Sequence, residues 1–215
     1  MPSTRILLIR HGETAWNAER RLQGHIDIAL NAEGKRQAAA LALALAGEQV
    51  DAIISSDLQR AHQTATAVAR LHAMPVHTDP GLRERCYGAF EGLLYAEIEQ
   101  RYPAEFAAWQ ARDVDSRVPD GERKAETFRQ FFQRSTASII AWGHKYPGGT
   151  LALVAHGGVL ECAYRAALAL SLETPRTFKV MNASINRFTI EEGKLVLDSW
   201  GEVAHLRQGA LDELP

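Results

Sequence analysis

The chain is poor in cysteine and has no long apolar run. Its 215 residues include two cysteines, Cys86 and Cys162, which have neither the spacing of a metal-binding pair nor the density of a disulfide framework. Cys86 is therefore interpreted as a small packing residue. The longest Ala/Leu stretch, Ala38 to Ala46, is too short to cross a bilayer, and the N-terminus lacks a basic segment and a cleavage site. We accordingly expect a cytoplasmic protein without a membrane partner.

Patterns typical of nucleic-acid, metal or nucleotide partners are also missing. The net charge of −2 gives no general attraction to nucleic acid or anionic lipid, so any anion site must be a local cluster of positive charge. The sequence has no His-Glu-x-x-His pattern, no Asp-rich loop and no Walker A pattern. We therefore expect no nucleic-acid partner, no metal site and no cofactor.

Hydrophobic patterning predicts alternating strands and helices. Short strands are expected at residues 5–9, 52–55, 75–78, 151–155, 184–190 and 195–200. Helices are expected from the N-cap Asn31 to about Gly47, and over 58–71, 94–111 with an interruption near Pro103, 125–145, and 158 to before Pro175. This alternation predicts an α/β fold, a three-layer α/β/α sandwich with a mostly parallel central sheet, and a single domain that spans residues 1–215.

Two of the expected strands end in the pair His-Gly. The first strand runs into Arg10-His11-Gly12, and a later one runs into His156-Gly157. Because open α/β sheets bind ligands beyond the carboxyl ends of their strands, the two imidazoles could meet at one crevice. A neutral imidazole is a nucleophile near pH 7, and an adjacent arginine can bind a phosphoryl group with its planar set of donors. These strand ends indicate a phosphoryl-transfer site.

Four sequence blocks follow one another in a recognisable order. They are Arg10 to Thr14 followed by Trp16-Asn17 and Gln23-Gly24; Ser55 to Ala61 with Thr64-Ala65; Leu82-Arg83-Glu84 with Gly88 and Glu91-Gly92; and Val154 to Gly158. In this order the blocks resemble the histidine phosphatase superfamily, which also contains the cofactor-dependent phosphoglycerate mutases. The resemblance spans most of the chain. It implies a phosphoglycerate mutase-like fold in which a small inserted cap, roughly residues 92–122, lies over the site.

The resemblance assigns roles to individual residues. It implies that His11 is the nucleophile and forms phosphohistidine, and that Glu84 is the general acid and base. It also implies that Arg10, Arg60 and His156 bind the phosphoryl group. The expected substrate-binding set is Arg10, Asn17, Gln23, Gly24, Arg60, Glu84, Tyr87, His156 and Gly157. The competing interpretations are that Arg60 is a solvated helix residue and that Glu84 forms a surface ion pair with a neighbouring arginine.

Positive charge in this site is expected to come from the protein itself. Arg10, Arg60 and an imidazolium at His156 would replace the cation that many phosphatases use. The remaining histidines have no ligand-type spacing and are interpreted as structural or surface residues; they are His25, His62, His72, His77, His144 and His205.

The departures from the family pattern favour a phosphatase over a mutase. Mutases of this family carry a basic residue soon after the third block and an arginine pair further along the cap, whereas here only Arg112 and Arg101 offer charge. Glu161 stands where family members often have arginine. We therefore expect hydrolysis of a small phosphorylated metabolite with release of inorganic phosphate. The alternatives are a cofactor-dependent phosphoglycerate mutase and a non-catalytic phospho-ligand binder, and a homodimer is kept open as the assembly.

Overall fold

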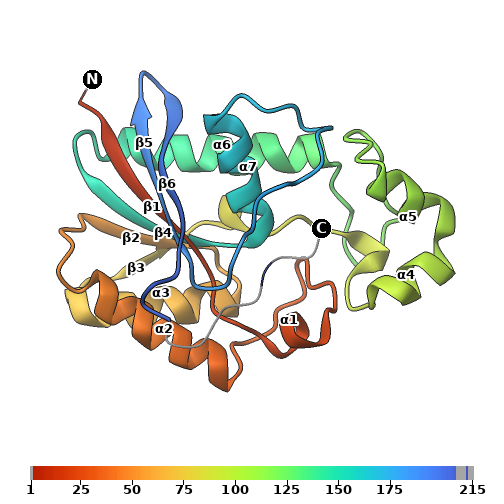
Figure 1. The fold of residues 1–215 in the computed structure, drawn as a ribbon, viewed down its shortest axis with the longest axis horizontal. Helices are drawn as coiled ribbons and strands as arrows, with labels where there is room; N and C mark the ends of the chain where they lie inside the picture. The colour runs from red at the N-terminus through yellow and green to blue at the C-terminus, as the bar shows by residue number, and fades with distance from the viewer. Residues whose placement is uncertain (1, 207–211, 213–215) are drawn as a thin grey trace.

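A mixed six-stranded sheet forms the centre of the molecule (Figure 1). The computed structural model describes residues 2–206 and 212. The strand order is β3-β2-β4-β1-β5-β6. The first four strands of that order are mutually parallel; β5 pairs antiparallel with β1, and β6 pairs antiparallel with β5. The strands are β1 (Thr4–Arg10), β2 (Ala52–Ser55), β3 (Val76–Thr78), β4 (Thr150–Ala155), β5 (Ile185–Glu191) and β6 (Lys194–Glu202). The mostly parallel sheet expected from the sequence is confirmed.

Helices cover both faces of this sheet (Figure 1). They are α1 (Ala15–Glu19), α2 (Ala32–Leu45), α3 (Gln59–His72), α4 (Tyr95–Arg101), α5 (Pro103–Gln110), α6 (Phe128–Lys145) and α7 (Gly157–Ala167), with short 3-10 turns η1 (Pro80–Leu82) and η2 (Gly88–Phe90). Helices α2 and α3 pack on one face, and α6 and α7 on the other. Within the described residues, none of the helices has the length and apolarity that a membrane crossing would need.

The apolar run of β1 is buried on both of its sides. Ile6 and Leu8 pack into the core beneath α6 and α7, whereas Leu7 and Ile9 pack into the core beneath α2 and α3. All four side chains are at most 2% exposed. A strand between two helical layers must be apolar at every position rather than at alternate ones, which explains the continuous run in the sequence.

Two helix boundaries have local causes in the structure. Helix α6 starts at Phe128 rather than near Ala125, because Thr127 is the N-cap and the Ala125 N–H donates to Asp120 Oδ1 at 2.9 Å. Helix α7 ends at Ala167, well before Pro175, and the chain then turns through a left-handed residue, Ala169, with φ 52°. The expectation that this helix ends before Pro175 is confirmed, and the turn at Ala169 rather than the proline ends it.

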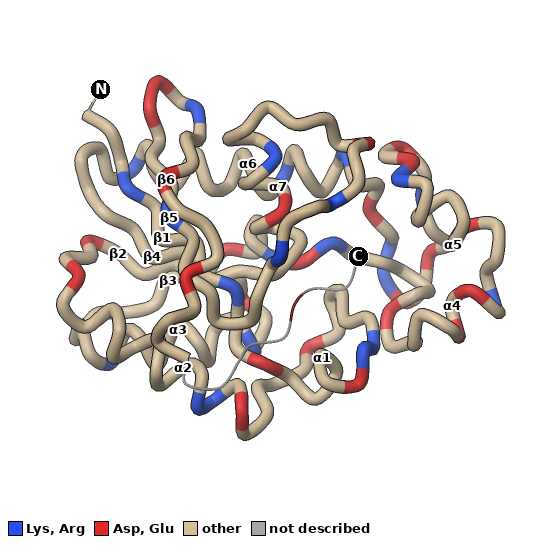
Figure 2. Tube along the Cα trace, in the orientation of Figure 1, with Lys and Arg blue, Asp and Glu red and all other residues tan. Residues whose placement is uncertain are grey.

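Helices α4 and α5 lie beyond the end of the sheet, at the right of Figure 1. Proline at the first position of α5 separates the two helices at the predicted interruption. They share a small apolar cluster with the loop that contains the third sequence block; its buried members are Leu22, Phe90, Ile98, Val118 and Ala125. Figure 2 shows that both signs of charge are spread along the chain, which fits the small net charge.

Candidate active site

A pocket beyond the carboxyl end of β1 contains most of the expected site residues. It is lined by Arg10, His11, Trp16, Asn17, Arg20, Arg21, Leu22, Gln23, Gly24, Arg60, Glu84, Tyr87, Tyr95 and Asp212. Two expected members, His156 and Gly157, are not part of the lining. His156 is fully buried beside His11, and Gly157 is the first residue of α7.

His11 is buried directly after β1, with 3% of its surface exposed. Its Nδ1 lies 2.7 Å from the Gly12 carbonyl oxygen. A carbonyl only accepts hydrogen bonds, so Nδ1 carries the proton and the Nε2 lone pair is available. Burial and the positive charges of Arg60 and Arg10 hold the pKa of His11 well below its ordinary value. The imidazole is therefore neutral at pH 7, as a nitrogen nucleophile requires.

His156 follows β4 and lies against His11, with ring centroids 5.2 Å apart. Its Nε2 is 2.8 Å from Ser56 Oγ, and its Nδ1 is a buried nitrogen without a hydrogen-bond partner in the described part of the chain. Burial, Arg60 and His11 lower the pKa of His156 well below 6.5. The expected imidazolium is thus corrected to a neutral imidazole, because a buried ring beside a guanidinium binds a proton poorly unless an anion is added.

Arg10 and Arg60 are both 1% exposed and are oriented by backbone carbonyls. Arg10 donates to the Val180 carbonyl at 2.7 Å, and Arg60 donates to the Gly24 and Ile26 carbonyls at 2.8 and 3.0 Å. Buried guanidinium groups that line a pocket are fixed positive charges for an anion. The alternative interpretation of Arg60 as a solvated helix residue is wrong, since the side chain points inward from α3.

The carboxylate of Glu84 is held by two backbone N–H groups. Arg85 N–H donates to Oε1 at 2.7 Å, and Gly158 N–H, in the first turn of α7, donates to Oε2 at 3.0 Å. The residue is 7% exposed and lines the pocket. Its neighbour Arg83 pairs with Asp57 instead, through contacts of 2.7 and 2.5 Å. Glu84 is therefore not a surface ion-pair residue.

The helix α1, which sequence reasoning missed, places two of the expected substrate residues. Thr14 caps α1, and its hydroxyl oxygen lies 3.0 Å from both Asn17 Oδ1 and Gln23 Oε1, so its single proton can bind either side chain. The Thr-x-x-Asn spacing of this capping box was the available signal. The same short helix brings Arg20 and Arg21 to the pocket lining, two cations that sequence reasoning did not select.

The two cap arginines singled out from the sequence lie outside this pocket. Arg112 pairs with Glu161 at 2.5 Å and donates to the Leu172 carbonyl. Arg101 is exposed and lies 4.0 Å from Glu97. Glu161, the residue that departs from the family pattern, therefore binds Arg112 rather than entering the phosphate pocket.

His25 and Cys86 flank the pocket without lining it. His25 Nε2 donates to the Glu84 carbonyl at 2.7 Å, which agrees with a structural role. Cys86 is 2% exposed, and burial raises the pKa of its thiol to about 11, in line with its interpretation as a packing residue. Among the described residues, no group of three His, Cys, Asp or Glu side chains is placed to hold a metal ion.

The chain is similar to known proteins over almost its whole length. The family model of the histidine phosphatase superfamily (branch 1) matches residues 6–203. The chain is 37% identical over 205 residues to the metal-independent phosphoserine phosphatase of Arabidopsis thaliana, covering 94% of this chain and 83% of the relative. It is 36% identical over 206 residues to phosphoglycerate mutase-like protein 4 of the same plant, covering 94% and 87%. The solved structure of Bacillus stearothermophilus YhfR matches with a TM-score of 0.86 at 32% identity, covering 94% of this chain and 98% of that one.

The chain belongs to the histidine phosphatase superfamily. Its fold is the phosphoglycerate mutase-like α/β fold that the sequence predicted. Family membership, together with relatives named as phosphatases, supports a phosphoric monoester hydrolase. Some relatives carry mutase names, so the choice between phosphate hydrolysis and mutase chemistry depends on the charged residues of this site.

Proposed function

We propose that the protein hydrolyses phosphate monoesters of small metabolites through a phosphohistidine on Nε2 of His11. One observation carries the proposal: the bond from Nδ1 to the Gly12 carbonyl leaves the Nε2 lone pair of a neutral imidazole in a pocket that also presents Arg10, Arg60 and Glu84. Fixed positive charge around a developing phosphoryl anion is the main requirement of phosphoryl transfer.

In the first step the Nε2 lone pair forms a bond to phosphorus while the bond from phosphorus to the alcohol oxygen breaks. Arg10 and Arg60 stabilise the negative charge on the phosphoryl oxygens. His156, behind His11, provides a further hydrogen-bonding group at Nδ1. Glu84, in its protonated form, gives its proton to the departing alkoxide, and the alcohol leaves.

In the second step Glu84 takes a proton from water, and the water oxygen attacks the phosphorus of phosphohistidine. The nitrogen–phosphorus bond breaks, its electron pair returns to Nε2, and inorganic phosphate leaves. Glu84 ends the cycle protonated and His11 ends it neutral, so the net reaction is ester plus water to alcohol plus phosphate. The nucleophile divides one slow displacement into two faster ones.

The distribution of cations favours hydrolysis over mutase chemistry. A mutase retains a bisphosphate and needs a second strong anion site for the distal group. Arg112 is neutralised by Glu161, and Arg101 lies outside the pocket, so neither supplies that site. Of the two other pocket cations, Arg21 donates to the Gly92 carbonyl at 2.6 Å and pairs with Glu19 at 3.3 Å, so among the described residues Arg20 alone remains, whereas a mutase of this family has an arginine pair. Residues 92–122 would act as a small cap that selects the alcohol, within a single domain of residues 1–215.

The proposal is tested by phosphate release from an unprimed enzyme. Purified protein, free of any bisphosphate, is mixed with a panel of small phosphate monoesters, and inorganic phosphate is measured. We expect the wild-type enzyme to release one phosphate for each ester molecule that it hydrolyses, and we expect His11→Ala to release none. The control His144→Ala should release phosphate at the wild-type rate, because His144 is exposed on α6. Isomerisation that requires a bisphosphate primer would identify a mutase, and binding without turnover would identify a non-catalytic binder. The cytoplasmic location and the homodimer remain predictions.

A further inference from the structure

We propose that Arg134, paired with Glu126, is a positioning residue that sets the place of the Glu84 carboxyl group for proton transfer. The inference rests on the proposed role of Glu84 as general acid and base. Arg134 does not line the pocket and so acts through Glu84 rather than on the substrate.

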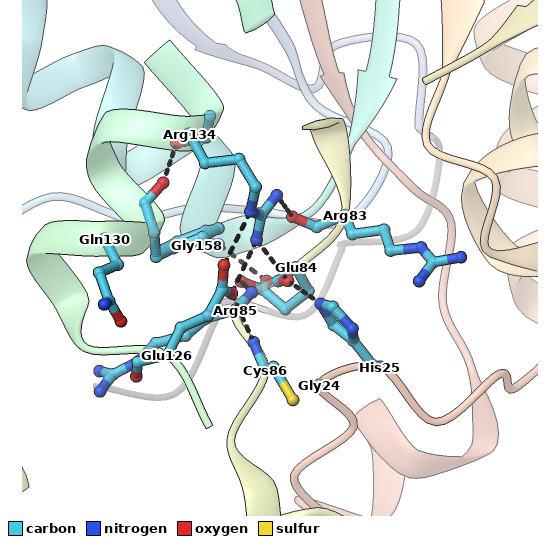
Figure 3. A network of polar contacts seen from close by, with 12 residues as sticks. Gly24, His25, Arg83, Glu84, Arg85, Cys86, Glu126, Gln130, Arg134 and Gly158 are labelled. Atoms are coloured by element: carbon cyan, nitrogen blue, oxygen red, sulfur yellow. Dashed lines mark hydrogen bonds and ion pairs between the residues drawn. The ribbon is translucent and has the colours of Figure 1, made fainter. Parts of the chain in front are cut away.

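The guanidinium of Arg134 binds the backbone of the segment that carries Glu84 (Figure 3). Its Nη1 donates to the carbonyls of Gly81 and Arg83 at 2.9 and 3.1 Å, and its Nη2 donates to the carbonyl of Glu84 at 3.2 Å. The same planar group forms a two-point contact with Glu126, with both distances 2.8 Å. One side chain of α6 thus binds two carbonyls that precede Glu84 and the carbonyl of Glu84 itself.

Glu126 fixes the chain on the other side of Glu84. Its Oε2 accepts from the Cys86 N–H at 2.9 Å, and its backbone N–H donates to the Cys86 carbonyl at 2.9 Å. Its own carbonyl accepts from Arg85 Nε at 3.0 Å. Figure 3 shows the Glu126 carboxylate between the Arg134 guanidinium and the Cys86 backbone. The Arg134–Glu126 pair therefore holds the backbone on both sides of Glu84.

The segment needs such a pair because regular structure does not hold it. It lies between η1 and η2 and, within the described residues, pairs with no strand, so side chains bind its carbonyls at Arg83 and Glu84. Burial raises the pKa of Glu126, but the hydrogen bonds from Arg134 and the Cys86 N–H outweigh that effect and lower its pKa overall. Glu126 is consequently ionised near neutral pH, which makes its two-point contact with the Arg134 guanidinium charge-assisted and directional.

Loss of this pair should damage the step in which Glu84 donates a proton. A displacement of about 1 Å in a reacting group can cost on the order of 10²-fold in rate. Glycerol phosphate serves as the alkyl phosphate in this test, because its alkoxide must be protonated as it leaves. We expect Arg134→Met to lower kcat on glycerol phosphate by roughly 10²-fold with little change in KM. Phosphorylation by p-nitrophenyl phosphate should change by less than about threefold, because nitrophenolate leaves without protonation.

Two controls separate this role from a general structural one. Arg129 lies on the same helix and forms a matching two-point contact with exposed Asp115, at 2.7 and 2.8 Å, but does not touch the Glu84 segment. Arg129→Met should leave both substrates unaffected. Arg134→Lys keeps the charge but loses the planar fork, and its kcat on glycerol phosphate should fall between those of wild type and Arg134→Met.

The deciding comparison is the double variant Glu84→Gln/Arg134→Met. If Arg134 acts through Glu84, the double variant is no slower on glycerol phosphate than Glu84→Gln alone. Additive losses, or equal losses for the two leaving groups in Arg134→Met, would overturn the inference while leaving the role of Glu84 intact. If Glu84→Gln itself lacks the leaving-group difference, the acid role in the proposed function fails, and the inference fails with it.

A second variant keeps the test decisive if circular dichroism shows that Arg134→Met does not fold. Glu126→Gln preserves side-chain shape but removes the charge that orients Arg134. Glu126→Gln should lower kcat on glycerol phosphate by roughly tenfold and should again affect p-nitrophenyl phosphate much less. A folded Glu126→Gln enzyme with equal rates to wild type on both substrates would contradict the proposal.

Discussion

The imidazoles of His11 and His156 lie side by side with ring centroids 5.2 Å apart, although the two residues are far apart in the sequence. The parallel pairing of β1 with β4 causes this arrangement, because its register sets Arg10 opposite Ala155 and each histidine is the next residue. Two buried rings beside two buried guanidinium groups give a site that favours neutral imidazoles until an anion enters.

This pairing should make stability depend on pH. The pKa values of His11 and His156 are both lowered in the folded protein. Below about pH 6.5 the unfolded chain therefore binds more protons than the folded one. The free energy of unfolding therefore falls as pH decreases from about 6.5 toward the folded-state pKa values. We expect Tm to drop between about pH 7 and 5 and the drop to be shallower in His156→Asn. An identical pH slope in His156→Asn, with exposed His144→Asn as the control, would contradict the assignment.

Glu84→Gln should affect the two half-reactions, phosphorylation of the enzyme and hydrolysis of phosphohistidine, in different ways. Phosphorylation by an alkyl phosphate should slow by on the order of 10²–10⁴, whereas phosphorylation by p-nitrophenyl phosphate should change much less. Hydrolysis of phosphohistidine should slow equally for both, since the intermediate is the same. Single-turnover measurements of each half-reaction provide the test. Equal phosphorylation defects would remove Glu84 as the acid and direct attention to Glu13 or Glu91.

Gly158 should tolerate no side chain. A Cβ there would overlap Glu84 Oε1 and lie 2.8 Å from Phe131 Cε1. Gly158→Ala should displace the carboxylate, lower turnover of alkyl phosphates and cost about 1–3 kcal/mol of stability from overpacking. Gly47→Ala is the control, because its Cβ would meet no atom within 4 Å. Wild-type turnover in folded Gly158→Ala would mean that the Glu84 position is not critical.

Turnover should not require a metal ion. Arg10 and Arg60 supply fixed positive charge in the pocket, the role that a bound cation has in many phosphatases. We expect full activity after exhaustive treatment with a chelator, measured as phosphate release. Activity that is lost on chelation and restored by a divalent cation would show that the protein charges are insufficient.

The sequence predicted the strand ends better than the surroundings of the site. His11 and His156 were found because an apolar strand stops at a polar pair, and that signal is local. Arg20 was missed because α1 is held by a capping box rather than by apolar periodicity. The charge state of His156 was also missed, since it depends on burial and on Arg60, which is distant in sequence.

The link from Arg134 to Glu84 could not be read from spacing at all. The two residues lie on separate elements, and the contact runs through backbone carbonyls, whose partners depend on the final path of the loop. By contrast, Asn31 was identified as an N-cap from its own side chain and the helix that follows, and it accepts from the Gly34 N–H at 2.7 Å.

The most direct test of the mechanism is to locate the phosphoryl group on the trapped intermediate. Glu84→Gln enzyme is mixed with p-nitrophenyl phosphate and quenched in base, and the modified residue and nitrogen are determined by mass spectrometry and phosphorus NMR. Because His11 Nδ1 donates to the Gly12 carbonyl, we expect phosphorylation at Nε2 of His11. A phosphoryl group on His156, on Nδ1 of His11, or on no histidine at all would contradict the account.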